Sequence, residues 1–221
     1  MALEDWLRGY YAILDVTPAE LAAEPGAIAE RAQRLLAAGP CCLQLRAKGA
    51  DAILLRDGAL RLIPLCRAAG VPFCMNDRLD VALAVGADVI HLGQDDLPVA
   101  EARRIVADAA HVTPRPVIGI STHNPAQAEA AIAAGADYIA LGPVFGTASK
   151  VNPDPVVGLE TLAAVCRRAS VPVVAIGGIT LDRVRDVASS GAAAAAVIAA
   201  VTRAPDPTAA GRAVRAAFAP R

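Results

Sequence analysis

The sequence has few aromatic residues and no long hydrophobic run. Phe, Trp and Tyr make up 3% of the 221 residues, although hydrophobic residues as a whole reach 55%. The hydrophobic residues occur in short blocks broken by charged residues, Gly and Pro, whereas a membrane-spanning helix needs about 18 or more consecutive apolar residues. Residues 1–6 also lack a basic stretch followed by an apolar one. We therefore expect neither a membrane span nor a signal peptide.

An excess of charge of one sign is also missing. The chain has 21 Lys and Arg against 22 Asp and Glu, which gives a formal net charge of -1. Nucleic acids and anionic membranes are bound by extended basic surfaces, so neither is an expected partner. The positive charges are expected to act locally, on small-molecule substrates. The sequence is compatible with a homo-oligomer but gives no sign of one.

Cysteine is scarce and irregularly placed. The five cysteines are odd in number, and the sequence contains neither a Cys-x-x-Cys pair nor a His-rich cluster. This pattern favours reduced thiols over a disulfide framework or a structural zinc site, and it predicts a cytoplasmic protein. The cysteines lie mostly in apolar stretches, at Cys41, Cys42, Cys66, Cys74 and Cys166.

Short β-rich runs alternate with longer stretches of helical periodicity. The runs are nearly continuously apolar, as in parallel strands covered on both faces. Eight strands are predicted, at residues 10–16, 41–46, 72–76, 89–92, 116–121, 138–142, 172–177 and 193–198. Helical spacing with one charged face is clear at residues 27–38, 98–109, 125–134 and 159–169. The alternation indicates an α/β protein with a parallel sheet.

A short glycine-containing phrase recurs before many of the predicted strands. Glycine readily adopts the left-handed conformation that ends a helix, so the phrase marks a helix-to-strand turn. Its spacing of roughly 25 residues favours a closed (β/α)₈ TIM barrel over an open sheet, with residues 1–221 as a single domain. The glycines concerned are Gly39, Gly70, Gly86, Gly135 and Gly191.

Polar residues gather where the predicted strands end, which is the catalytic face of such a barrel. Asp77 and Asp96 follow two consecutive strands, and paired carboxylates suit Mg²⁺. Three separated cations, Arg46, Lys48 and Lys150, suit a polyphosphate. Simpler interpretations exist: Asp96 could cap the helix that follows, and Arg46 and Lys48 could face solvent where their strand ends. Taken together, the charges predict a magnesium diphosphate site.

These residues and their order resemble the thiamine-phosphate synthase family. The matching segments are residues 44–48 (Gln-Leu-Arg-Ala-Lys), 76–82 (Asn-Asp-Arg-Leu-Asp-Val-Ala), 91–96 (His-Leu-Gly-Gln-Asp-Asp), 119–123 (Gly-Ile-Ser-Thr-His), 142–150 (Gly-Pro-Val-Phe-Gly-Thr-Ala-Ser-Lys) and 176–179 (Ile-Gly-Gly-Ile). The resemblance implies an enzyme that joins 4-amino-2-methyl-5-(diphosphomethyl)pyrimidine to hydroxyethylthiazole phosphate, or its carboxylated form. The products would be thiamine phosphate and pyrophosphate.

The resemblance also implies roles for individual residues. Asp77 and Asp96 would hold Mg²⁺ on the diphosphate, and the catalytic set would be Arg46, Lys48, Ser121 and Lys150. His91 is expected to be packed and not to be a ligand. The implied substrate-binding residues are Gln44, Leu45, Arg46, Ala47, Lys48, Asn76, Ser121, Thr147, Ala148, Ser149, Lys150, Gly178, Ile198 and Ala199, the last two through backbone N–H groups.

Three departures from the family pattern bear on these roles. Ala47 stands where many relatives have Glu, Phe145-Gly146 replaces an aromatic-Pro pair, and residues 192–200 lack the Asp or Ser that relatives often carry. Two alternatives also stay open. A thiazole tautomerase of the same barrel type would use His123 for acid-base chemistry without a metal, and a non-catalytic barrel would only bind thiamine phosphate.

Overall fold

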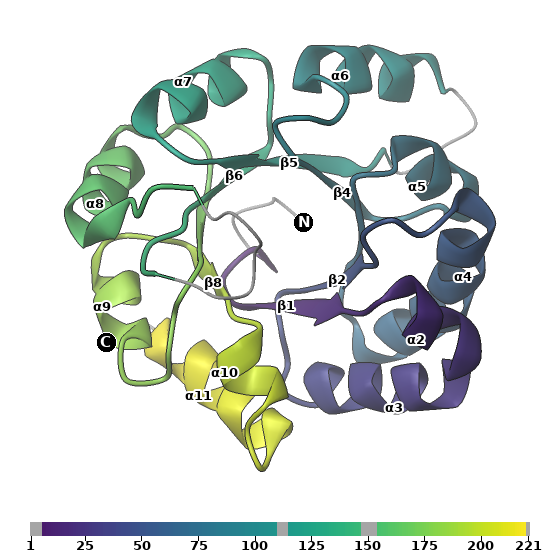
Figure 1. Ribbon diagram of the computed structural model, residues 1–221. Helices are drawn as coiled ribbons and strands as arrows, with labels where there is room; N and C mark the ends of the chain where they lie inside the picture. Colours follow the sequence, from purple (N-terminus) through teal and green to yellow (C-terminus); the bar gives the residue numbers. More distant parts are fainter. Residues whose placement is uncertain (1–5, 110–114, 147–153, 220–221) are drawn as a thin grey trace.

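Eight parallel strands form a closed barrel, as the sequence predicts (Figure 1). The structure is a computed structural model, and it describes residues 6–109, 115–146 and 154–219. Each strand pairs with the next, and β8 pairs with β1 to close the ring. The strands are β1 (Gly9–Asp15), β2 (Cys42–Arg46), β3 (Phe73–Asn76), β4 (Val89–Leu92), β5 (Val117–Thr122), β6 (Tyr138–Leu141), β7 (Val173–Ile176) and β8 (Ala194–Ala196).

Helices surround the barrel and join successive strands. In the described ranges they are α2 (Pro18–Ala23), α3 (Pro25–Leu36), α4 (Ala52–Ala69), α5 (Leu79–Val85), α6 (Val99–Asp108), α7 (Pro125–Ala133), α8 (Gly158–Arg168), α9 (Val184–Ser189), α10 (Ala199–Thr202) and α11 (Pro207–Ala217). The four helices predicted by name correspond to α3, α6, α7 and α8, with ends shifted by up to two residues. The sequence analysis did not single out α4 or α11.

Local chemistry explains where the helices begin and end. The side chain of Asp51 accepts the backbone N–H of Leu54 and so caps α4, while Asn124 caps α7 through Gln127 N–H. At the other ends, Gly70 and Gly86 adopt left-handed conformations after α4 and α5. All five glycines of the recurring phrase have positive φ, which confirms the predicted helix-to-strand turns.

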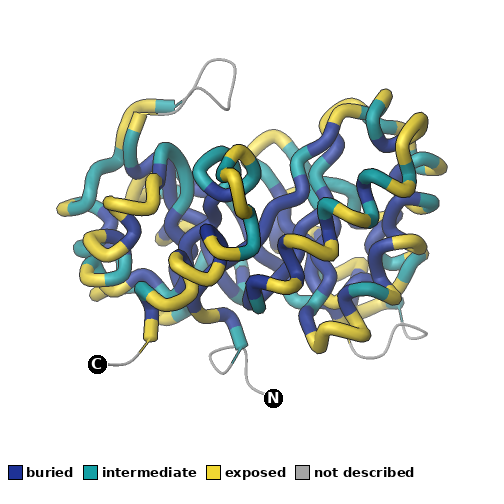
Figure 2. The backbone as a smooth tube through the Cα atoms, turned by 90° about the horizontal axis from the view of Figure 1, so that it is seen from below, coloured by how far each residue is buried: buried dark blue, intermediate teal, exposed yellow. Residues whose placement is uncertain are grey.

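Alternate strand residues face two separate cores. Leu43 and Leu45 point outward, into the layer between the strands and the helices. Tyr11, Cys42 and Tyr138 belong to a second cluster, which fills the barrel interior. Figure 2 shows the buried strands inside a shell of helices whose outward sides are exposed. This alternation decides which side chain at a strand end can reach a ligand inside the barrel mouth.

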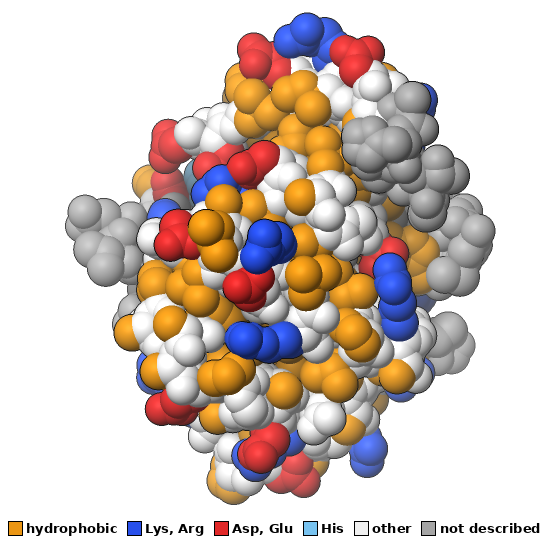
Figure 3. Space-filling view, turned by 90° about the vertical axis from the view of Figure 1, so that its right-hand side faces the viewer, with side chains coloured by type: hydrophobic (Ala, Val, Ile, Leu, Met, Phe, Trp, Pro, Cys, Tyr) orange, Lys and Arg blue, Asp and Glu red, His pale blue; other side chains and the backbone are white. Residues whose placement is uncertain are grey.

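The outer surface carries charges of both signs. On the side that includes α4, Figure 3 shows basic and acidic groups interspersed with apolar ones, as the near-zero net charge predicts. In the part of the chain that the structure describes, no helix is long and apolar enough to cross a membrane. The five cysteines are all free thiols, which agrees with the expectation of reduced cysteines.

Candidate active site

Gln44 and Asn76 meet at the carboxyl ends of β2 and β3. Both point into the barrel, and the Gln44 side-chain amide donates to Asn76 Oδ1 over 3.1 Å. Gln44 is only 2% exposed, so its amide is held in place by packing as well as by this bond. The structure thus brings together two of the predicted substrate-binding residues.

Asp77 and Asp96 also come together. Burial, followed by the hydrogen bond and negative charge of Asp96, raises the pKa of Asp77 to about 6, while Arg46 and Lys48 act in the opposite direction. Asp77 has a φ of +62°, an unusual left-handed conformation for a residue other than glycine. Its N–H donates to the His91 carbonyl over 2.8 Å, which anchors this strained turn to the neighbouring strand. Two of the predicted cations therefore act on the predicted carboxylate pair.

The carboxylate pair fits a hard divalent cation. Burial and the neighbouring Asp96 both disfavour the charged form of Asp77, and a cation bound between the two carboxylates would offset both effects. Among the described residues, no group of three or more His, Cys, Asp or Glu could hold a metal. Mg²⁺ keeps several waters and is commonly bound through one or two carboxylates plus substrate phosphate oxygens, so a pair is sufficient.

Arg46 is held by a residue that the sequence analysis missed. Arg46 Nη1 lies 2.6 Å from Asp15 Oδ1, and the two side chains are only 27% and 30% exposed. The register explains the contact, because Asp15 and Arg46 are directly paired on β1 and β2. Asp15 is the last residue of β1 and lies one residue before the end of the first predicted strand, so it too is a polar residue at a strand end.

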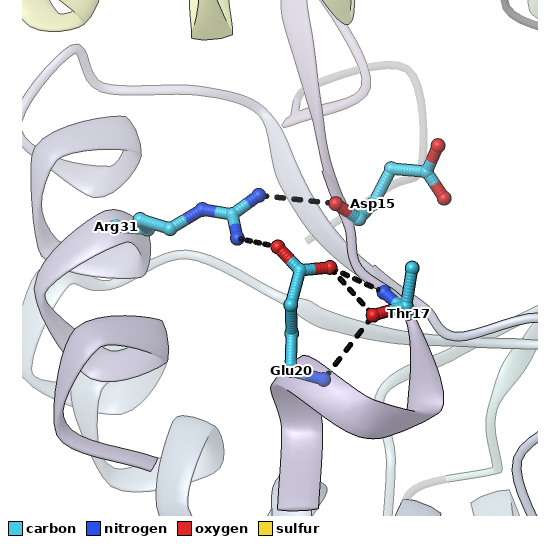
Figure 4. Close-up of polar contacts among 4 residues, drawn as sticks. All are labelled: Asp15, Thr17, Glu20 and Arg31. Carbon is cyan, nitrogen blue, oxygen red and sulfur yellow. Dashed lines mark hydrogen bonds and ion pairs between the residues drawn. The ribbon is translucent and has the colours of Figure 1, made fainter. Parts of the chain in front are cut away.

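A second set of contacts fixes the chain around Asp15 (Figure 4). Thr17 and Glu20 form a capping box at the start of α2. Arg31 of α3 donates to Glu20 Oε1 over 3.2 Å and to the Asp15 carbonyl over 3.1 Å. The Asp15 carboxylate points away from this set and is left to Arg46. The orientation of Arg46 thus depends on a network that extends to two helices outside the barrel.

Some predicted residues need correction, and some cannot be placed. The side chains of Leu45 and Ala47 are buried in the outer core, so only their backbones can face a substrate. Lys48 is exposed just beyond β2, where it acts on Asp77. Thr147, Ala148, Ser149 and Lys150 lie outside the described residues.

Ser121 stands on the opposite wall, near the end of β5. Its hydroxyl oxygen is 3.0 Å from His91 Nε2, and its carbonyl accepts the side-chain amide of Gln94 over 2.7 Å. His91 is 8% exposed and is packed inside the barrel, as expected. Burial lowers the pKa of His91 to about 4, so the ring is neutral at physiological pH.

Two glycines after β7 allow the neighbouring loop to approach closely. Gly178 has a φ of +65°, and a Cβ there would lie 2.4 Å from the carbonyl oxygen of Gly146. A Cβ on Gly177 would lie 2.5 Å from Pro143. The turn after β7 therefore supports the start of the loop after β6. Beyond β8, Ile198 and Ala199 mark the beginning of α10, with their side chains partly exposed.

A model of the thiamine monophosphate synthase family matches residues 13–201. The chain belongs to this family.

Individual relatives agree with the family match. Thiamine-phosphate synthase from Chloroflexus aurantiacus is 44% identical over 178 residues, which are 80% of this chain and 79% of the relative. Thiamine-phosphate synthase from Roseiflexus sp. is 43% identical over 198 residues, 90% of this chain and 81% of the relative. The solved thiamine phosphate pyrophosphorylase from Pyrococcus furiosus has a TM-score of 0.81 at 34% identity, and the match covers 96% of both chains.

These likenesses support the synthase interpretation and give no support to a thiazole tautomerase or a non-catalytic barrel. His123, the residue that a tautomerase would use, has its Nδ1 2.7 Å from the Gly142 carbonyl and 3.5 Å from Asp154 Oδ2. His123 therefore links the end of β5 to Gly142, just after β6, and to Asp154, shortly before α8.

Proposed function

We propose that the protein is a thiamine-phosphate synthase that condenses the diphosphomethyl pyrimidine with hydroxyethylthiazole phosphate, or its carboxylated form, and releases pyrophosphate. With the carboxylated form, CO₂ is released as well. The observation that carries the proposal is the gathering of Asp77 and Asp96 within electrostatic reach of Arg46 and Lys48. A site with two carboxylates and two cations at one barrel mouth suits a crowded anion better than any neutral substrate. The family match supports the pyrimidine diphosphate as that anion.

In the proposed reaction, the bond between the pyrimidine CH₂ and the diphosphate oxygen breaks, and its electron pair leaves with the diphosphate. The electron-rich aminopyrimidine stabilises the positive charge that remains. The thiazole nitrogen then uses its lone pair to form the new C–N bond, so no general base is required. The enzyme's task is to stabilise the departing negative charge and to hold the two substrates in line.

The residues of the mouth suit this task. Arg46, oriented by Asp15, would offer fixed positive charge, and Lys48 would add a mobile one. Asn76 and Ser121 would donate hydrogen bonds to the same diphosphate. When bound to Asp77 and Asp96, Mg²⁺ would neutralise diphosphate oxygens and favour their departure.

The remaining assignments complete the proposal. The packed Gln44 amide would face the polar edge of the pyrimidine, and the backbones of Leu45 and Ala47 would line its path. The phosphate of the thiazole would bind backbone N–H groups at Gly178, Ile198 and Ala199. Thr147, Ala148 and Ser149 would contribute from the loop after β6, with Lys150 as a further cation on the leaving group. Five free thiols support a reducing, cytoplasmic setting.

The test is the release of pyrophosphate from the two purified substrates, with Mg²⁺ and after its removal with EDTA. We expect thiamine phosphate and pyrophosphate to form in equal amounts and only with the metal. Binding of each substrate is measured in parallel by isothermal titration calorimetry. Metal-independent isomerisation of the thiazole would indicate a tautomerase, and binding without product would indicate a non-catalytic barrel, so either result refutes the proposal.

A further inference from the structure

A chain of hydrogen bonds crosses the barrel interior from β1 to the catalytic mouth. Tyr11 Oη lies 3.0 Å from Tyr138 Oη, Tyr138 Oη lies 2.9 Å from His91 Nδ1, and His91 Nε2 lies 3.0 Å from Ser121 Oγ. The two tyrosines and His91 are buried, and Ser121 is at the boundary with solvent. The chain therefore connects the packed interior to a single hydroxyl in the mouth.

Each member of this chain has one proton to donate, so the direction of one hydrogen bond limits the direction of the next. Each hydroxyl carries one hydrogen, and the neutral imidazole carries one N–H. The His91 ring lies with a hydroxyl at each nitrogen, so in its neutral form one nitrogen donates and the other accepts. If Tyr11 donates to Tyr138, then Tyr138 is free to donate to His91 Nδ1 and Nε2–H to donate to Ser121. The Ser121 proton is then available to a ligand.

We infer that Tyr11, Tyr138 and His91 are positioning residues, which hold the Ser121 hydroxyl as a hydrogen-bond donor to a phosphate oxygen of the substrate. The inference rests on the proposed function, because that function puts a diphosphate beside Ser121. An anion at the mouth accepts a hydrogen bond from the Ser121 hydroxyl. It therefore favours the arrangement in which each group donates toward Ser121 over the reverse arrangement. Hydrogen bonds in such a chain polarise one another, which strengthens the last donor.

The packing around the chain fixes the positions of its rings. His91 and Tyr138 are stacked, with ring centroids 5.6 Å apart and an interplanar angle of 29°. Between them on the sheet lies Gly119, which is paired with both residues. A Cβ at Gly119 would lie 2.0 Å from the Tyr138 ring, so the absence of a side chain makes room for the tyrosine. Gln94 holds the Ser121 backbone through its carbonyl.

Such a chain is an unusual filling for a barrel. Burying three polar side chains is unfavourable unless their hydrogen bonds are satisfied, and apolar side chains of similar size would pack the same space. In the described part of the chain, His91 is the hydrogen-bond partner of Ser121 Oγ. The polar chain therefore ends on the Ser121 hydroxyl at the boundary with solvent, where a ligand could accept a hydrogen bond from it.

The first experiment is a double-mutant cycle with Tyr138→Phe and Ser121→Ala. Tyr138→Phe deletes the hydroxyl and keeps the ring. We expect kcat to fall about tenfold, the effect of losing one buried hydrogen bond, with little change in KM. In the Ser121→Ala background the same change should have no further effect, because the chain acts only through Ser121. Independent, multiplicative losses would mean that Tyr138 has a merely structural part, and would overturn the inference.

Tyr10→Phe is the matched control. Tyr10 lies next to Tyr11 on β1 but faces the outer core, and its hydroxyl is buried with no hydrogen-bond partner in the described structure. The substitution deletes the same group, a buried tyrosine hydroxyl, at a position next to Tyr11 that is outside the chain of hydrogen bonds. We expect kcat to stay at the wild-type value. An equal loss in Tyr10→Phe and Tyr138→Phe would attribute both effects to general packing.

The second experiment does not depend on catalysis. The chain has three histidines, so the ring nitrogens of His91 can be assigned in ¹⁵N NMR spectra by comparison with His91→Gln. With inorganic pyrophosphate and Mg²⁺ we expect the Nε2–H tautomer in the wild type and a mixture of tautomers in Tyr138→Phe. A His91 ring protonated at Nδ1, or ¹⁵N shifts that do not change with pyrophosphate, would overturn the inference. If the wild-type protein shows no turnover, only the proposed function is refuted, because the His91 tautomer still reports on the chain of hydrogen bonds.

Discussion

Asp77 and Asp96 place two carboxylates close together at the mouth of the barrel, where their negative charges repel each other. Burial, together with the hydrogen bond and charge of Asp96, raises the pKa of Asp77 to about 6, even with Arg46 and Lys48 nearby. A site built in this way is incomplete without a cation. The pair could be predicted because the carboxyl ends of consecutive parallel strands must be neighbours. The ion pair between Asp15 and Arg46 was not predicted, because it depends on the direction of the Asp15 side chain at the end of β1.

We predict that Asp96→Asn lowers turnover about 100- to 1,000-fold, the usual range for losing one preorganised electrostatic contact. The amide can still accept the Gly93 N–H that Asp96 accepts over 2.7 Å, so stability should change little. Removing the like charge should also lower the pKa of Asp77. Initial rates over a Mg²⁺ titration and ¹³C carboxyl shifts over pH measure both effects. A wild-type Mg²⁺ titration curve would show that Asp96 is not a ligand.

We predict that Asp15→Asn lowers kcat about tenfold, because Arg46 loses the partner that fixes its orientation. The unfolding free energy should fall by about 1 kcal/mol, the upper range for a partly exposed ion pair. Steady-state kinetics and urea unfolding measure the two effects. Asp57→Asn is the control, because it breaks an exposed ion pair with Arg56 on α4. Equal kinetics in the two variants would contradict the prediction.

The loop after β6 packs against the two glycines that follow β7. Gly178 leaves space for the backbone carbonyls of Phe145 and Gly146, so the two connections pack without an intervening side chain. Arg183, at the start of α9, lies over the Phe145 ring with its guanidinium carbon 4.8 Å from the centroid. The sequence marks Gly177 and Gly178 as a turn, but the residues that they accommodate are known only from the structure.

We predict that Gly178→Ala displaces the start of this loop and impairs activity more than its backbone conformation alone would explain. Gly70→Ala is a close control, since Gly70 has the same φ of +65° but open space around it. The left-handed conformation should destabilise Gly70→Ala by about 1 kcal/mol. Gly178→Ala should lose more, because a Cβ would also meet backbone atoms. Thermal unfolding and KM for the thiazole phosphate compare them; equal losses would argue against loop support.

The barrel itself was predictable because its repeat is visible in one dimension. Apolar runs, helical stretches and glycine turns recur along the chain, and closure follows from their number. The contacts inside the barrel were not predictable in this way. Tyr11 and Tyr138 are 127 residues apart, and they meet only because the strands tilt and stagger around the ring. No local pattern in the sequence reports which inward side chains reach one another across that space.

The buried His91 should make the stability of the whole fold depend on pH. Its pKa is about 4 in the folded protein against 6.5 when unfolded, so the unfolded chain binds more protons between these values. Stability from His91 is thus complete above pH 6.5 and is lost as pH falls toward 4, by at most about 3 kcal/mol. Asp77 acts oppositely, because its raised pKa makes its contribution disappear as pH rises through about 6.

We predict that His91→Gln, which has no titrating group, loses less stability than the wild type as the pH is lowered from 7 to 4.5. Comparing the two proteins cancels the contribution of Asp77, which both retain. Urea unfolding at each pH, followed by circular dichroism, gives the two curves. Parallel curves would mean that His91 is not buried in its neutral form.

The empty position at Gly119 links the evolution of two neighbouring strands. The Tyr138 ring on β6 fills the volume that a side chain at Gly119 on β5 would occupy. Only one of the two positions can therefore carry a large side chain. A descendant that gained even a methyl group at position 119 would have to shorten residue 138, and would thereby sever the path from Tyr11 to Ser121. Among diverging copies of this enzyme, the two positions should change together or not at all.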